Sequence, residues 1–235
     1  MFLVVAAVAV PFSYDGTLRS GQTLAIRDVN GSVRVRTGDR LSIRATKRAN
    51  RGDPNAVAIR IDTRSNGIIV CVRYPPQTNR ACDEPGTQEN HNNDTSVAFD
   101  VTVPRGIVLD ASSVNGDVDV VNDGPTEVTT VNGNVRADGR DVQKATTVNG
   151  TVTVDVHDRS RGSLVASTVN GSIDVTLPPG TGLSLDAGTV TGDINASGMK
   201  VERPRYGPGA RASGTLGDGA LHLSLHTTNG SITLH

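Results

Sequence analysis

Apolar and polar residues alternate after a short corner motif that recurs along the chain. Val-Asn-Gly or a close variant occurs seven times, with its second residue at Asn30, Asn115, Asn132, Asn149, Asn170, Thr191 and Asn229. From Asn115 onward these positions are 17, 17, 21, 21 and 38 residues apart. Residues three and five positions after the corner are small or apolar, whereas those two and four positions after it are polar. The pattern predicts a short strand after each corner, with the third and fifth side chains buried.

The repeat length favours a parallel β-solenoid. Asn and Gly both tolerate positive φ, so each corner can turn the chain sharply between two strands. One such corner would indicate only a hairpin, but a period of 17–21 residues matches one coil of a solenoid, whose strands pair with their equivalents about 4.8 Å away. A chain of antiparallel hairpins is the alternative. We therefore expect an all-β parallel β-solenoid (β-helix) in which the corner asparagines stack in a hydrogen-bonded ladder, namely Asn30, Asn115, Asn132, Asn149, Asn170 and Asn229.

The chain begins with an apolar run that suits a secretory signal. Phe2–Val10 is too short to span a bilayer as a helix, and Ala7-Val8-Ala9 has the small-x-small form of a cleavage site. The basic segment that normally precedes such a run is missing, so residues 1–11 would be a truncated signal segment. A buried first strand is the alternative.

The rest of the chain divides into two β-rich parts. Residues 12–105 predict longer strands that form an N-terminal cap or small sheet, which a solenoid needs to cover its open end. Residues 106–235 hold the repeats, with a Pro/Gly-rich insert near 202–219 that loops out. Ser213-Gly214 stands where a degenerate repeat is expected, and Leu221–His235 closes the chain with a final repeat.

The composition fits thin repeated β structure. The 235 residues include only six aromatic side chains but 26 glycines, which argues against the deep mixed core of a conventional enzyme. The abundance of Val, Ile and Leu and a net charge of −1 argue against disorder, and the glycines lack the period of collagen. Neither half of the chain is basic enough for a dedicated nucleic-acid-binding protein, and no specific nucleic acid is expected as a partner.

The two cysteines, Cys71 and Cys82, predict one disulfide if the protein is exported. Such a bond would hold the polar stretch 75–95 close to its strand. Two thiols do not complete a structural zinc site, and only His91 lies nearby. If the protein is cytosolic, two free thiols are the alternative.

The segment VAFDVTVPRGIVLDASSVNGDVDV (residues 97–120), the repeats that follow it and the ending GDGALHLSLHTTNGSITL (residues 217–234) resemble the bacterial putative-adhesin domain family. The resemblance extends from about residue 20 to the end of the chain. It implies an envelope-associated or secreted β-solenoid and carries no catalytic signature. The adhesin function of that family enters here as a hypothesis, because a shared fold does not fix a function.

No cluster of catalytic groups emerges from the repeats. Asp119 and Asp174 share one column but lie three coils apart, near 14 Å at the rung spacing of a sheet, and Asp117 and Asp193 are farther apart. His222 and His226 lie in an alternating strand, where four residues span roughly 13 Å, so they cannot hold one metal ion. We expect no enzyme, no cofactor and no metal site.

The outward residues two and four positions after each corner and the two inserts are expected to form the contact surface, and an arginine-rich face in the N-terminal part is a further candidate binding surface. Arginine forks suit phosphate and carboxylate groups, so a polyanion site is predicted at Arg34, Arg36, Arg44, Arg60 and Arg64, with a solvated sheet face as the alternative.

The function expected is a non-enzymatic adhesion or surface-interaction module of the bacterial envelope, periplasmic or extracellular. Its partners would be envelope polymers or other surface proteins, and no transmembrane span is expected in the mature chain. The alternatives are a scaffold that assembles into homo-oligomers through the solenoid ends, and a polysaccharide-active β-helix enzyme.

Overall fold

The computed structural model describes residues 8–84, 93–158, 161–205 and 207–235. The described part is all-β: it contains nineteen strands, one 3₁₀ turn at Pro54–Ala56 and no α-helix. The strands of the N-terminal half are β1 (Val8–Gly16), β2 (Thr23–Arg27), β3 (Val33–Gly38), β4 (Leu41–Ala49), β5 (Ala58–Arg64), β6 (Gly67–Arg73), β7 (Ser96–Pro104), β8 (Val108–Ser112) and β9 (Val118–Thr129). Those of the C-terminal half are β10 (Val135–Thr146), β11 (Val152–Val156), β12 (Gly162–Asn170), β13 (Ile173–Thr176), β14 (Leu183–Thr191), β15 (Ile194–Ala196), β16 (Val201–Glu202), β17 (Ala210–Leu216), β18 (Leu221–Asn229) and β19 (Ile232–Leu234).

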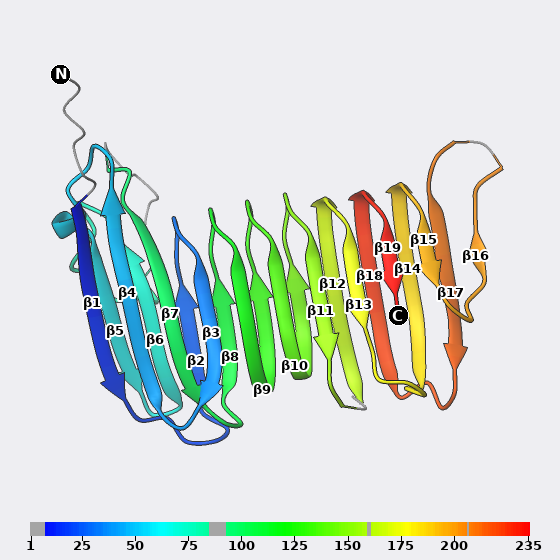
Figure 1. Ribbon diagram of the computed structural model, residues 1–235, viewed down its shortest axis with the longest axis horizontal. Helices are drawn as coiled ribbons and strands as arrows, with labels where there is room; N and C mark the ends of the chain where they lie inside the picture. Colours follow the sequence, from blue (N-terminus) through cyan, green and yellow to red (C-terminus); the bar gives the residue numbers. More distant parts are fainter. Residues whose placement is uncertain (1–7, 85–92, 159–160, 206) are drawn as a thin grey trace.

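The strands pair in two ladders, which we call the first and the second ladder. The first runs in spatial order β1, β4, β7, β3, β9, β10, β11, β13, β19 and β15. The second runs β5, β6, β2, β8, β9, β10, β12, β18, β14, β17 and β16. The long strands β9 and β10 belong to both ladders, so all nineteen strands join into one sheet. Figure 1 shows the strands side by side along the long axis of the molecule.

The pairing between repeats is parallel. In the first ladder the third residue after each corner faces its equivalent in the neighbouring repeat, in the order Val33, Val118, Val135, Val152, Ile173, Ile232 and Ile194. All of these residues are buried, as are those five positions after the corner. The residues two positions after the corner are all exposed. The alternation predicted from the sequence is therefore confirmed, and the inward side chains of both ladders form one continuous apolar core.

The spatial order of the repeats differs from their order in the sequence at both ends of the chain. The repeat of β2 and β3 lies between the strands β6/β7 and β8/β9, so Asn30 pairs with Asn115 inside the row. The part expected as a separate cap, residues 12–105, thus includes one internal repeat. Likewise, the final repeat does not end the row, because β18 and β19 lie between β12/β13 and β14/β15.

Antiparallel strands flank the parallel repeats. At the N-terminal side β4 pairs with β7 and β1, and β5 pairs with β6. Residues 8–11, which fall in the expected signal segment, belong to β1, whereas residues 1–7 lie outside the described part. At the other side β17 pairs antiparallel with β14 and contains Ser213-Gly214. The expectation of a degenerate parallel repeat there is therefore wrong, and only part of the insert 202–219 loops out.

Glycine is required at the corners because adjacent repeats approach closely there. At Gly133, where φ is +159°, a Cβ atom would lie 2.2 Å from the carbonyl oxygen of Gly116. No side chain fits at that distance, so the backbone itself fills the space between neighbouring corners.

Substitution of a corner asparagine tests this arrangement. Asn149 donates to Asn132 and accepts from Asn170, so Asn149→Ala removes two hydrogen bonds and leaves a donor and an acceptor of its neighbours unpaired. We expect the free energy of unfolding to fall by roughly 1–3 kcal/mol. Chemical denaturation measures it, and Asn195→Ala, an exposed asparagine four positions after a corner, is the control, expected within about 0.5 kcal/mol of the unmodified chain. Equal losses in both variants would contradict the ladder.

Candidate functional site

The corners align into a regular surface feature, which we call the corner ridge. It consists of the corner residues Asn30, Asn115, Asn132, Asn149, Asn170, Asn229 and Thr191 and of the exposed valines before them, Val131, Val148, Val169 and Val190. In each neighbouring pair of asparagines the Nδ2 amide of one donates to Oδ1 of the next at 2.8 Å. The amides are thus held in a fixed orientation along the whole row.

Each end of the amide row has a different partner. At one end the Asn30 Nδ2 atom donates to the Tyr74 hydroxyl at 3.4 Å, and that hydroxyl donates to the carbonyl oxygen of Thr95 at 2.6 Å. Burial raises the pKa of Tyr74 to about 12, so its hydroxyl stays protonated at physiological pH. At the other end the Thr191 Oγ1 hydroxyl donates to Asn229 Oδ1 at 2.7 Å.

Four valines of the ridge remain partly exposed. Val131, Val148 and Val169 belong to three consecutive repeats and expose 37%, 39% and 41% of their surface, and Val190 exposes 59%. Thr228 stands between Val169 and Val190 in this column, because Asn229 pairs between Asn170 and Thr191. The three adjacent, partly exposed valines Val131, Val148 and Val169 form a candidate contact surface.

A second row, inside the corner, carries a hydroxyl in every repeat but one. The residue two positions before the corner asparagine donates its hydroxyl to the glycine carbonyl oxygen of the neighbouring repeat, at 2.9–3.1 Å. These residues are Ser113, Thr130, Thr147, Thr168, Thr189 and Thr227. Asp28 takes this position in the repeat of β2 and β3.

Asp28 is a buried carboxyl group without a good partner. It is 4% exposed, and neither carboxyl oxygen makes a hydrogen bond within the described part of the chain. Burial raises its pKa from 3.8 to about 7, and the nearby amides of Val29 and Asn30 offset this only in part. Asp28 was not predicted from the sequence, although its contrast with the hydroxyl residues of the other repeats could have identified it.

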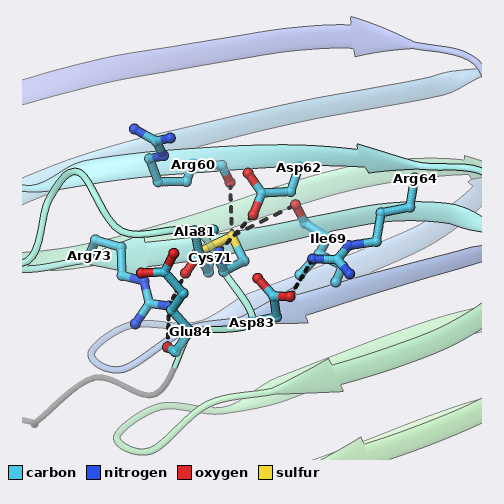
Figure 2. Close-up of a disulfide and its surroundings, with 10 residues drawn as sticks. Arg60, Asp62, Arg64, Ile69, Cys71, Arg73, Ala81, Asp83 and Glu84 are labelled. Carbon is cyan, nitrogen blue, oxygen red and sulfur yellow. Dashed lines mark hydrogen bonds and ion pairs between the residues drawn. A yellow bond between two sulfur atoms is a disulfide. The ribbon is translucent and has the colours of Figure 1, made fainter.

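The two cysteines form a disulfide between β6 and the loop that follows it, and Figure 2 shows its surroundings. The Cys82 amide donates to Asp62 at 2.6 Å, and the Arg73 guanidinium donates to the carbonyl oxygens of Ala81 and Glu84. These contacts and the disulfide hold residues 81–84 against β5 and β6. Of the polar stretch 75–95, residues 85–92 lie outside the described part.

The five arginines predicted as a polyanion site do not share one surface. Arg34, Arg36 and Arg44 lie on the first ladder, whereas Arg60 and Arg64 lie on β5 of the second. Four of the five face carboxylates: Arg36 and Arg34 lie 2.6 and 3.8 Å from Asp119, Arg44 lies 3.0 Å from Asp15 and Arg64 lies 2.8 Å from Asp83. Three carboxylates, those of Asp15, Asp83 and Asp119, therefore balance part of the positive charge of the five arginines.

The carboxylates and histidines singled out in the sequence stay apart. Asp119, Arg136, Thr153 and Asp174 stand in successive positions of the first ladder, which separates the two carboxylates by about 14 Å at the usual strand spacing. His222 and His226 are both exposed on β18. Among the described residues no group of three metal-ligating side chains comes together, and no helix is long and apolar enough to cross a membrane.

Replacement of Asp28 by the residue type of the other repeats tests its role. Because the pKa of Asp28 is raised by folding, the folded chain binds this proton more tightly than the unfolded chain. Below about pH 4 the carboxyl group is protonated in both states, and its contribution to the free energy of unfolding is fully present. This contribution is lost as the pH rises through about 7, because the buried carboxyl group must then lose its proton. Asp28→Thr supplies the hydroxyl found elsewhere in the row and should increase the free energy of unfolding at pH 8 by roughly 2–4 kcal/mol, with a much smaller gain at pH 4.

Denaturation of both chains between pH 4 and 8 measures this difference, and Asp100→Thr, at an exposed position of β7, is the control. A gain from Asp28→Thr that is the same at both pH values would contradict a neutral buried carboxyl group.

A solved bacterial structure shares the fold of this chain. A structure described as a "putative cell adhesion protein" from Clostridium sporogenes ATCC 15579 aligns with 96% of this chain and 99% of its own, at a TM-score of 0.50 and 13% identity. A "putative adhesin" from Bacteroides fragilis NCTC 9343 aligns over 96% of this chain and 97% of its own, at a TM-score of 0.32 and 10% identity, which is too low to inform on the fold. No protein-family model matches the sequence, and neither does any curated protein. The resemblance to bacterial putative adhesins that the repeats indicate is confirmed, and what the likeness to the Clostridium structure shows is a shared fold.

Proposed function

We propose that this chain is a non-enzymatic surface-interaction module, built as a parallel β-solenoid, which contacts its partner through the corner ridge. The observation that carries the proposal is the row of partly exposed valines at equal positions of consecutive repeats, beside asparagine amides of fixed orientation. Apolar side chains with adjacent hydrogen-bonding groups provide both contact area and specificity.

The solenoid is supported by the parallel register of the repeats. Each repeat adds one strand to the first ladder and one to the second, with the corner between them, and the inward residues of both ladders share one core. Such a stack repeats its surface groups at the strand spacing of about 4.8 Å. A regular spacing suits an extended partner that itself repeats, such as an envelope polymer.

The asparagine amides retain capacity for a partner. Each amide group has two N–H donors and an oxygen with two lone pairs. Within the row, the side-chain amides of Asn132 and Asn149 each donate one hydrogen bond from Nδ2 and accept one at Oδ1. Each amide therefore keeps one N–H donor and one lone pair for a partner. Because the row already fixes their orientation, binding would require little further ordering of these side chains.

Export to the bacterial surface fits the disulfide of Cys71 and Cys82, since disulfides persist in oxidising compartments. It also fits the shared fold with a protein described as a cell adhesion protein. We place the protein in the periplasm, at the envelope or outside the cell.

The alternatives have less support. A polysaccharide-active enzyme needs paired carboxylates about 5–10 Å apart. Asp119 and Asp174, which share one column of the repeats, do not form such a pair, because they stand three repeats apart and Asp119 pairs with Arg36. A scaffold that polymerises through the ends of the stack would need free parallel strands there. Among the described strands, β1, β5 and β16 at the ends of the ladders are antiparallel to their neighbours, and the one parallel end strand, β15, is only three residues long.

Removal of the apolar row tests the proposal. The variant V131S/V148S/V169S should bind at least 10-fold more weakly than the unmodified chain to whichever of peptidoglycan sacculi, lipopolysaccharide or teichoic acid the latter binds, because three exposed apolar contacts are lost. Sedimentation with the sacculi and surface plasmon resonance with the soluble polymers measure this.

Val165→Ser is the matched control, since Val165 is also 37% exposed but lies on the outer face of β12, away from the ridge. The control should bind like the unmodified chain. Failure of the unmodified chain to bind any of the three polymers, whole bacteria or host matrix, or unchanged binding by the triple variant, would refute the proposed contact surface.

A further inference from the structure

The last fifteen residues of the chain occupy an internal position in the stack. Strand β18 pairs in parallel with β12 on one side and with β14 on the other, and β19 lies between β13 and β15. Figure 1 shows these red strands inside the row, with the yellow and orange strands β14 to β17 beyond them. The segment Leu221–His235, which we call the terminal coil, therefore fills a slot between two repeats that precede it in the sequence.

The terminal coil makes all the contacts of an internal repeat. Its inward residues Leu223, Leu225 and Ile232 are at most 2% exposed. Asn229 donates to Asn170 at 2.8 Å and accepts from Thr191 at 2.7 Å, so the amide row passes through the coil. Without the coil, both walls of the slot would expose unpaired strand edges and apolar side chains.

The two walls of the slot are alike. Leu164 of β12 and Leu185 of β14 face Leu223 from opposite sides in the same register. The pairs Ala166/Ala187 and Thr168/Thr189 flank Leu225 and Thr227 in the same way. Since every copy of this chain has the same two walls, the slot of one copy fits the terminal coil of another as well as its own.

Only a short link joins the coil to the rest of the chain. Strands β17 and β18 lie on opposite sides of β14, so residues 217–220 must cross the end of that strand. Gly217 and Gly219 have φ angles of +60° and +67°, which favour glycine. A short connection of this kind favours the exchange of the element that follows it between two copies.

We propose that the terminal coil is an exchangeable element, which can leave its own slot and occupy the equivalent slot of another copy of this chain. Reciprocal exchange between two copies preserves every ladder pair and every buried contact of the slot, and changes only the path of the link. The exchange is independent of what the corner ridge binds, because it depends only on the contacts between β18/β19 and their neighbours.

Two single-cysteine variants of the full chain test the exchange. Val165 and Ser224 are register partners across β12 and β18, and both face outward. Chains carrying Val165→Cys and Ser224→Cys are mixed, unfolded and refolded together at high concentration, and then oxidised. The native cysteines are bonded to each other, so the new thiols can pair only between chains. We expect a covalent heterodimer whose linking peptide joins positions 165 and 224.

The control mixture combines Val165→Cys with Thr228→Cys, which lies four residues farther along β18, about 13 Å away. A yield of heterodimer no higher than in this control would overturn the proposal. A V165C/S224C double variant, oxidised within one chain beforehand, provides a second measurement. It should remain monomeric by light scattering at concentrations at which the refolded unmodified chain forms dimers, and equal dimerisation of both would equally overturn the proposal.

Discussion

The close contact between successive corners governs the structure. Neighbouring backbones approach so closely at Gly116 and Gly133 that no side chain fits between them, and the corner asparagines can then bond to one another directly. When the corner asparagine of one repeat bonds to that of its neighbour, it also sets the register of the strands before and after the corner. The inward valines, isoleucines and leucines follow from that register, and together they form a narrow core that needs few aromatic side chains.

Because each corner presents the same groups to both neighbours, the order of the repeats in space is not tied to their order in the sequence. The repeat of Asn30 pairs with that of Asn115 although 85 residues separate them, and Asn229 fits between Asn170 and Thr191. These insertions place both ends of the repeat region inside the stack.

Much of this architecture could be predicted from local patterns. The alternation after each corner correctly identified buried positions such as Val118 and Val120 and exposed ones such as Asp117, because strand geometry fixes them within a few residues. The neighbour of a given repeat could not be predicted, since Asn30, Asn149 and Asn229 have nearly the same flanking residues. The antiparallel strand β17 was missed for a related reason, because its Ser-Gly pair resembles a weak corner.

The surface was harder to predict than the core. The arginines of β3, β4 and β5 suggested one cationic face, but their carboxylate partners Asp15, Asp83 and Asp119 come from other parts of the chain, which the sequence pattern does not bring together. Exposure of the ridge valines was also not evident, because a valine next to a corner can face either side. By contrast, Asp28 could have been identified from the sequence, because the position two residues before the corner holds Ser or Thr in the other repeats.

The amide row is open to direct measurement by nuclear magnetic resonance. Hydrogen exchange of the Nδ2 groups of Asn115, Asn132, Asn149 and Asn170 should be slowed relative to that of Asn195, and each should show nuclear Overhauser contacts to the corner asparagine of its spatial neighbour. The decisive contact is between Asn170 and Asn229. If the repeats were stacked in the order of the sequence, the repeat of Thr191 would lie between these two residues and they would not be in contact. Exchange as fast as that of Asn195, or a contact of Asn170 with Thr191 in place of Asn229, would contradict the account.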